Sequence, residues 1–173
     1  YFAPGSLARL FRRAGFDVVD IAVEYGDQYL TIEARPLAPG AAPSPPLAIE
    51  ESVAAFATIV DSFSSGIDAT LRGWRDRLDA ARRDGKKVVL WGSGSKAVAF
   101  LTTLGLDDHV AWVTDINPHR HGCFMPKTGQ EIVPPKALTT LGPDIVVVMN
   151  AVYVDEIRND LAAMGLSPEI LSL

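Results

Sequence analysis

The sequence predicts a mixed α/β fold: a small parallel sheet with helices on both faces, preceded by a long helix and by a short helix with a β-hairpin. Three observations support this prediction. After Gly85, short apolar runs alternate with segments of helical spacing. From Ile49 to Asp84, apolar residues recur every three or four positions without a proline. A glycine-rich turn at residues 92–97 follows the first apolar run of the alternating part.

The first 35 residues predict one helix and one hairpin. Apolar residues at helical spacing predict a helix over residues 4–14. Two alternating segments, 16–23 and 29–34, predict antiparallel strands joined by a glycine turn. Because one helix and one hairpin bury little core, we expect this segment to be the end of a larger domain.

A proline-rich linker and a long helix come next. Between Pro36 and Pro46, five prolines in eleven residues predict a semi-extended linker and a domain boundary. The spacing over Ile49–Asp84 predicts one amphipathic helix, with a break at Ser64-Ser65-Gly66 left open. Acidic and basic side chains alternate on its charged face, which indicates a solvated surface and no nucleic-acid site.

The remaining residues predict the parallel sheet. Strands and helices alternate there, which is typical of crossovers between parallel strands. The predicted strands are 88–91, 110–114, 132–133, 145–149 and 170–171, and the predicted helices are 96–104, 135–141 and 154–164. We therefore divide the chain into residues 1–35, a linker at 36–47, a long helix at 48–85 and a sheet domain at 86–173.

Composition excludes several classes of protein. The chain has 173 residues, of which 48% are hydrophobic and 21% charged, as in ordinary soluble domains. Its net charge of −5 gives no reason to expect nucleic acid, and no apolar run reaches the length of a membrane span. A single cysteine, Cys123, is consistent with a reducing cytoplasm. Since the chain starts at Tyr1 without a methionine, we expect a fragment of a longer protein.

The strongest functional signal is the run Gly92-Ser93-Gly94-Ser95-Lys96-Ala97. Backbone N–H groups at a helix N-terminus, together with the helix dipole, suit a phosphate or another anion. The spacing fits the dinucleotide-binding fingerprint G-x-G-x-x-G/A of Rossmann-like domains. Asp115, 23 residues after Gly92, would accept hydrogen bonds from a ribose diol. Capping of the turn at Asn117-Pro118 is an alternative role for Asp115.

Candidate binding residues gather at the ends of three predicted strands, where ligands of parallel sheets bind. They are Gly92, Ser93, Gly94, Ser95 and Lys96 after the first strand, Asp115, Asn117 and Arg120 after the second, and Asn150 and Tyr153 after the fourth. Lys96 would add a positive charge for an anion, and Arg120 is either a solvated loop residue or a contact to a phosphate. His119 and His121 have no neighbouring cysteine or acidic cluster, so we expect no metal. No catalytic arrangement is evident, and we assign no catalytic residue.

Residues from about Lys87 to Leu173 resemble the C-terminal domain of the sugar C-methyltransferase family. The resemblance rests on Leu90–Ala97, Val113–Pro118, Gly122–Pro126, Ile132–Pro135 and Pro143–Val148, followed by Asn150, Tyr153 and Glu156-Ile157. Tyr1–Leu7 and Ala14-Gly15-Phe16 resemble the closing helix and hairpin of a class I S-adenosylmethionine methyltransferase. Pro126-Lys127-Thr128 and Met149-Asn150 depart from the family's Pro-Gly-Thr and Trp-Asn, which leaves the identity of the sugar open.

The resemblance implies methyl transfer from S-adenosylmethionine to a nucleotide-sugar-like or related small metabolite. It places the cofactor mostly in a preceding methyltransferase portion, which would be a partner of this chain, and assigns substrate binding to this chain. A fragment of this kind would be inactive alone and would hold no cofactor. Two alternatives stay open: a nucleotide-binding module of the NAD type, and a non-catalytic assembly domain that forms a homodimer through the long helix.

Overall fold

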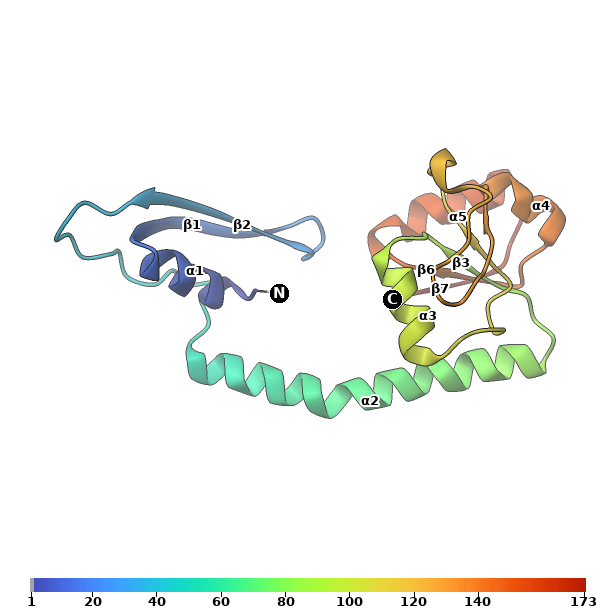
Figure 1. Ribbon diagram of the computed structural model, residues 1–173, viewed down its shortest axis with the longest axis horizontal. Helices are drawn as coiled ribbons and strands as arrows, with labels where there is room; N and C mark the ends of the chain where they lie inside the picture. Colours follow the sequence, from blue (N-terminus) through green and yellow to red (C-terminus); the bar gives the residue numbers. More distant parts are fainter. Residues whose placement is uncertain (1) are drawn as a thin grey trace. The chain divides into compact units, whose positions relative to one another are not determined.

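The structure is a computed structural model that describes residues 2–173, so Tyr1, the first residue of the Tyr1–Leu7 motif, lies outside the described part. The chain divides into two compact units, Tyr1–Ile67 and Asp68–Leu173. Helix α2, Val53–Arg83, runs from the first unit into the second (Figure 1). The division therefore falls within the long helix, and the proline-rich segment belongs to the first unit.

The first unit contains the predicted helix and hairpin. Helix α1 (Pro4–Arg13) precedes the antiparallel strands β1 (Phe16–Glu24) and β2 (Tyr29–Pro36). Ala8, Val18 and Ile21 form a small buried core between them, and Phe11, Ile32 and Leu47 pack against it. The elements that the sequence predicts for these residues are confirmed.

The proline-rich segment is held to this hairpin by Asp17. The Asp17 carboxylate accepts hydrogen bonds from the Ser44 backbone N–H at 2.7 Å and from the Ser44 hydroxyl at 3.1 Å. Arg35 on β2 donates to the same carboxylate at 2.9 Å. These bonds hold the pKa of Asp17 below its ordinary value, the Ser44 N–H having the largest effect. The linker is thus fixed in place at Ser44.

Two glutamates explain why α2 starts later than predicted. Arg12 donates to both oxygens of Glu50, each at 2.7 Å, and the Gly5 N–H donates to Glu51 at 2.8 Å. These contacts hold residues 50 and 51 against α1, outside a helix. Ser52 then caps α2, since its hydroxyl accepts from the Ala55 N–H at 3.1 Å. The predicted start at Ile49 is wrong for this reason.

Helix α2 is continuous through Ser64-Ser65-Gly66, so the break that the sequence left open is absent from this described helix. Its second half is part of the second unit's core. Leu78 and Ala81 are buried there, and Trp74 packs with its ring centroid 5.3 Å from that of Phe100. The first half instead carries exposed apolar side chains, at Val53, Ile59, Val60 and Phe63.

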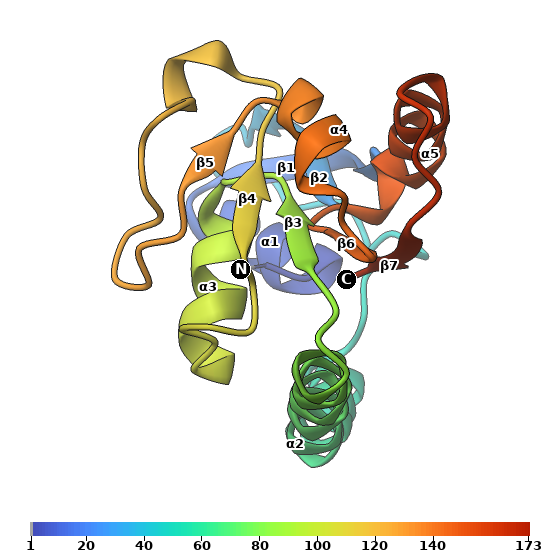
Figure 2. The same cartoon turned by 90° about the vertical axis from the view of Figure 1, so that its right-hand side faces the viewer.

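The second unit is built on a five-stranded parallel sheet, which confirms the predicted fold class. The strands are β3 (Val88–Trp91), β4 (Trp112–Thr114), β5 (Ile132–Val133), β6 (Ile145–Val148) and β7 (Glu169–Ser172), in the order β5-β4-β3-β6-β7. Figure 2 shows the strands side by side in this order. Strand β4 begins two residues later than predicted, although Val110 is buried.

Helices cover both faces of this sheet. Helix α3 (Ser95–Leu104) and the second half of α2 pack on the face that carries Val88 and Leu90. Helices α4 (Leu138–Leu141) and α5 (Val154–Ala163) pack on the face that carries Val89 and Trp91. The helix predicted over 135–141 is a 3-10 turn, Pro135–Ala137, followed by α4. With both faces covered, the carboxyl ends of the strands are where a sheet of this kind binds ligands.

Candidate functional site

A pocket of about 260 Å³ lies where the chain reverses its direction through the sheet. From β3 the chain moves outward to β4 and β5, then returns to β6 and continues to β7. The carboxyl ends of β3 and β6 therefore border a crevice, which is where open α/β sheets bind ligands. Trp91 and Gly92 line the pocket from β3, and Met149 and Asn150 line it from β6.

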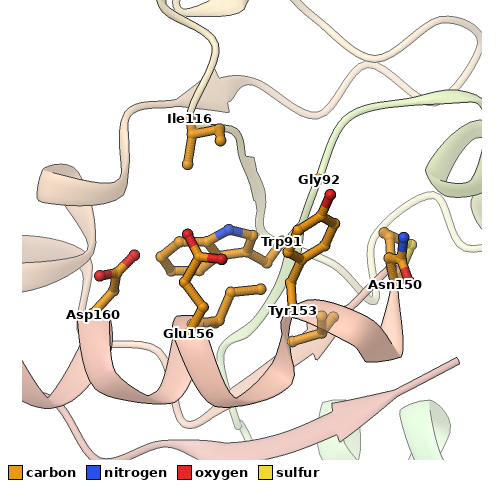
Figure 3. Close-up of a pocket in the computed structure, with 10 residues that line it drawn as sticks. Trp91, Gly92, Ile116, Asn150, Tyr153, Glu156 and Asp160 are labelled. Carbon is orange, nitrogen blue, oxygen red and sulfur yellow. The ribbon is translucent and has the colours of Figure 1, made fainter. Parts of the chain in front are cut away.

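The floor of the pocket is apolar and its rim is polar. Trp91, Val148, Met149 and Ile157 are buried and form the floor. The rim includes Tyr153, Glu156 and Asp160 from the segment that leads into and forms α5 (Figure 3). Their spacing of three and four residues places them on one face of the chain as it becomes helical. Ile116, from the loop after β4, lies across from them and is largely exposed.

The glycine turn begins at the wall of this pocket. Gly92 has φ of +108°, a conformation that other residues rarely adopt, and a Cβ there would lie 3.4 Å from the Met149 Cβ. Gly94 is the N-cap of α3, and a Cβ there would meet nothing within 4 Å. Ala97 is fully buried against the sheet. The first glycine is thus required by the backbone, whereas the space beside the second is open.

Asp115 holds this turn in place through four hydrogen bonds. Its Oδ2 accepts from the Ser93 N–H at 2.8 Å and from the Ser93 hydroxyl, while Arg120 donates to the same oxygen at 3.3 Å. Its Oδ1 accepts from the Asn117 N–H at 2.9 Å, which is the capping role foreseen for the turn. Burial opposes ionisation of Asp115, yet these bonds hold its pKa below the ordinary value.

Arg120 lies between the turn and the solvent. Its guanidinium donates to the Ser93 hydroxyl at 3.0 Å, and its side chain remains 44% exposed. His121 forms a hydrogen bond with the backbone carbonyl of Asp115 at 2.7 Å. The side chain of Asn117 accepts from the His119 N–H at 3.1 Å and caps the turn Pro118–Arg120. Arg120 is therefore the cation next to the glycine turn.

The structure divides the predicted site residues into two neighbouring groups and leaves three residues outside them. Gly92, Asn150 and Tyr153 line the pocket, and Ser93, Asp115, Asn117 and Arg120 form the network beside it. Gly94 caps α3, and Ser95 and Lys96 are exposed in its first turn without lining the pocket. Sequence reasoning missed Trp91, Ile116, Glu156 and Asp160 as pocket residues. For Glu156 and Asp160, the spacing of three and four residues after Tyr153 was the signal in the sequence that could have found them.

Residues 2–173 contain neither of two further features. No group of three or more histidine, cysteine, aspartate or glutamate side chains in this part of the chain is arranged to hold a metal ion. None of the described helices combines the length and the apolar content needed to cross a membrane.

Solved structures with a similar fold are oxidoreductase and repressor domains. One is the UDP-D-quinovosamine 4-dehydrogenase from Vibrio fischeri, with 24% identity over 51% of this chain and 77% of that chain, at a TM-score of 0.42. Another is RSP, a Rex-family repressor, with 12% identity over 51% of this chain and 52% of that one, at a TM-score of 0.40. RSP in complex with beta-NADH gives 11% identity, 55% and 58% coverage, and a TM-score of 0.39.

Comparison by sequence identifies the family. No curated protein matches the chain significantly. The model of the C-methyltransferase C-terminal domain matches residues 47–167, which include α2, the strands β3, β4, β5 and β6 and the residues that line the pocket. This match spans more than half of the described residues, and the chain therefore belongs to the C-methyltransferase C-terminal domain family.

Proposed function

We propose that this chain supplies the substrate-binding part of an S-adenosylmethionine-dependent C-methyltransferase that acts on a nucleotide-sugar-like metabolite. The observation that carries the proposal is the pocket between β3 and β6, formed by residues of the family's own domain. Its polar rim and apolar floor suit a small polar molecule that is held in one orientation.

The charged part of such a substrate finds a cation next to the pocket. Arg120 presents a half-exposed guanidinium beside Ser93, one residue from the pocket wall at Gly92. Arginine pairs with phosphate oxygens through two parallel hydrogen bonds. We therefore assign phosphate binding to Arg120, with exposed Lys96 as a second positive charge.

The NAD alternative fits the residues less well. A dinucleotide site of this type needs a carboxylate after the second strand that is available to the ribose diol. Asp115 stands at that position, but its Oδ2 already accepts three hydrogen bonds from Ser93 and Arg120, and its Oδ1 accepts one from the Asn117 N–H. A ribose diol that contacts both carboxylate oxygens would therefore compete with the bonds that hold the glycine turn.

S-adenosylmethionine supplies the methyl group in this proposal, and we expect it to bind mainly in a preceding portion of the enzyme. The residues of this chain bind and orient the acceptor molecule. We also expect the chain to work together with that methyltransferase portion as its partner, in the cytoplasm.

Isothermal titration of the chain with UDP-glucose, S-adenosylmethionine and NAD tests the proposal. We expect binding of UDP-glucose and no heat from the other two. Arg120→Ala should raise the Kd for UDP-glucose roughly tenfold, because a hydrogen bond to a charged group contributes about 1.5–3 kcal/mol. Arg158→Ala, on an exposed arginine of α5 outside the pocket, is the matched control and should leave the Kd unchanged.

Tight binding of S-adenosylmethionine would contradict the proposal, because it would place the cofactor site in this chain. Binding of NAD without UDP-glucose would favour the NAD-type module instead. If the chain binds none of the three ligands, nucleotide sugars are excluded as its substrate class.

A further inference from the structure

We propose that the pocket between β3 and β6 takes an uncharged or cationic hydroxylated ring and excludes the phosphate groups of the same ligand. The inference rests on the proposed function and names the part of the substrate that enters the pocket. It follows from the charge of the rim, from the indole N–H of Trp91 at the pocket floor and from the size of the cavity.

The rim is acidic without a compensating base. Among the ten described residues that line the pocket, Glu156 and Asp160 are carboxylates and none is basic. Figure 3 shows both side chains projecting from α5 toward the indole of Trp91 and toward Ile116. A phosphate in this space would meet two like charges next to apolar walls, where repulsion is stronger than in water. Hydroxyl or ammonium groups would instead donate hydrogen bonds to the carboxylates.

Trp91 provides an independent sign of a ligand. Its side chain lies on the pocket floor and the residue is 7% exposed. No hydrogen-bond partner of the indole N–H is found within residues 2–173. The nitrogen atom is not fully buried. An indole N–H is a hydrogen-bond donor only, so a ligand atom that accepts a hydrogen bond can pair with it in the pocket.

The donor and acceptor groups together select the ligand chemistry. A hydroxyl accepts from the Trp91 N–H and at the same time donates to a carboxylate such as that of Glu156. A phosphate accepts in the same way but has no proton for Glu156 or Asp160. The flat indole also offers a surface for a ring, and it attracts a cation that lies over its face. A hydroxylated ring, with or without an amino group, therefore satisfies all of these groups.

The size of the pocket suits one ring better than a whole nucleotide sugar. At about 260 Å³ it is smaller than the roughly 300–1,000 Å³ of sites that enclose a whole drug-sized ligand. We therefore place the remainder of a nucleotide sugar outside the pocket. Gly92 forms part of the wall, and Ser93 next to it contacts Arg120. The phosphates are then directed toward Arg120, away from Glu156 and Asp160.

Titrations with separate pieces of a substrate test this assignment through tryptophan fluorescence. The probes are methyl α-glucopyranoside as a neutral ring, glucosamine as a cationic ring and pyrophosphate as the anion. The Trp91→Phe variant identifies the part of the signal that comes from Trp91. We expect both rings to change the Trp91 signal, with glucosamine binding more tightly, and pyrophosphate to leave it unchanged.

Variants of the rim separate hydrogen bonding from charge. Glu156→Ala and Asp160→Ala should each weaken binding of both rings roughly tenfold, since each removes a charged acceptor. Glu156→Gln keeps an acceptor, so it should retain most of the affinity for the glucopyranoside and reduce the preference for glucosamine. Asp155→Ala removes an exposed carboxylate of the same helix outside the pocket and should change neither affinity.

Two results would overturn the inference. One is a Trp91 signal from pyrophosphate alone, and the other is equal ring affinity in the wild type and in Glu156→Ala and Asp160→Ala. If UDP-glucose binds but is unaffected by these two variants, the inference fails and the proposed function stands. If UDP-glucose does not bind at all, the proposed function fails first and the assignment of the pocket fails with it.

Discussion

The Asp115 carboxylate accepts a hydrogen bond from the Ser93 N–H at 2.8 Å, so the end of β4 determines the path of the chain after β3. The Ser93 hydroxyl donates to the same oxygen, and Arg120 contacts both side chains. The residue that resembles a ligand-binding carboxylate in the sequence thus supports the turn. We therefore propose ligand binding for the neighbouring residues that Asp115 holds in place.

Asp115→Ala should destabilise the second unit by about 1–3 kcal/mol, because it leaves the buried Ser93 N–H without its partner. Urea unfolding followed by circular dichroism measures this change. Asp107→Ala, on an exposed carboxylate, is the matched control and should stay within about 0.5 kcal/mol of the wild type. Equal stability of the two variants would contradict the structural role of Asp115.

Alanine substitutions at Gly92 and Gly94 should have opposite consequences. Gly92→Ala places a side chain at φ of +108° and 3.4 Å from the Met149 Cβ, so it should cost about 1–3 kcal/mol of folding free energy. Gly94→Ala enters open space at an ordinary φ of −76° and should leave stability nearly unchanged. Thermal unfolding separates the two variants. A larger loss in Gly94→Ala than in Gly92→Ala would show that the turn has another conformation.

Most of the second unit's fold could be predicted because its strands are buried on both faces. Val88–Trp91 and Ile145–Val148 are apolar at every position, and such runs are typical of central parallel strands. The start of α2 could not be predicted in the same way. Glu50 is a good helix former in isolation, but its ion pair with Arg12 depends on a contact between distant parts of the sequence.

The candidate site could be predicted only in part. The rule that ligands bind at the carboxyl ends of strands correctly indicated Gly92, Asn150 and Tyr153 as residues that line the pocket. Glu156 and Asp160 were missed because charged residues on a helix usually face solvent. Their position in the pocket depends on how α5 packs beside β3 and β6, and sequence periodicity does not contain that information.

The two halves of α2 should respond differently to truncation of a large apolar residue. Leu78 is fully buried in the second unit's core, so Leu78→Ala should cost about 2–5 kcal/mol. Phe63 is 64% exposed, and Phe63→Ala should change stability by less than about 0.5 kcal/mol. Urea unfolding compares the two variants. A similar loss in both would mean that the first half is packed as well.

Homodimer formation through α2 stays a prediction, and the exposed residues are the ones that test it. Leu71 packs against the second unit's core, so its substitution would confound folding with association. A Val60→Glu and Phe63→Glu double variant changes only exposed positions. If the helix pairs with a second copy, light scattering should show a dimer for the wild type and a monomer for this variant. A wild-type monomer at the same concentration would contradict the prediction.

Acid should loosen the first unit through Asp17 and Glu50. The pKa of Asp17 is lowered mainly by the Ser44 N–H, and that of Glu50 mainly by its hydrogen bonds with Arg12. A lowered pKa means that the carboxylate stabilises the folded state above its ordinary value and that this contribution is lost as the pH falls toward the folded-state value. The first unit should therefore keep its stability above about pH 4.5, the ordinary value for glutamate, and lose it progressively below that.

Hydrogen exchange of the Ser44 N–H, relative to Leu30 in β2, follows the release of the proline-rich segment. In Asp17→Asn the Ser44 N–H should exchange faster at neutral pH and respond less to acid, and unchanged protection in that variant would show that another contact holds the segment.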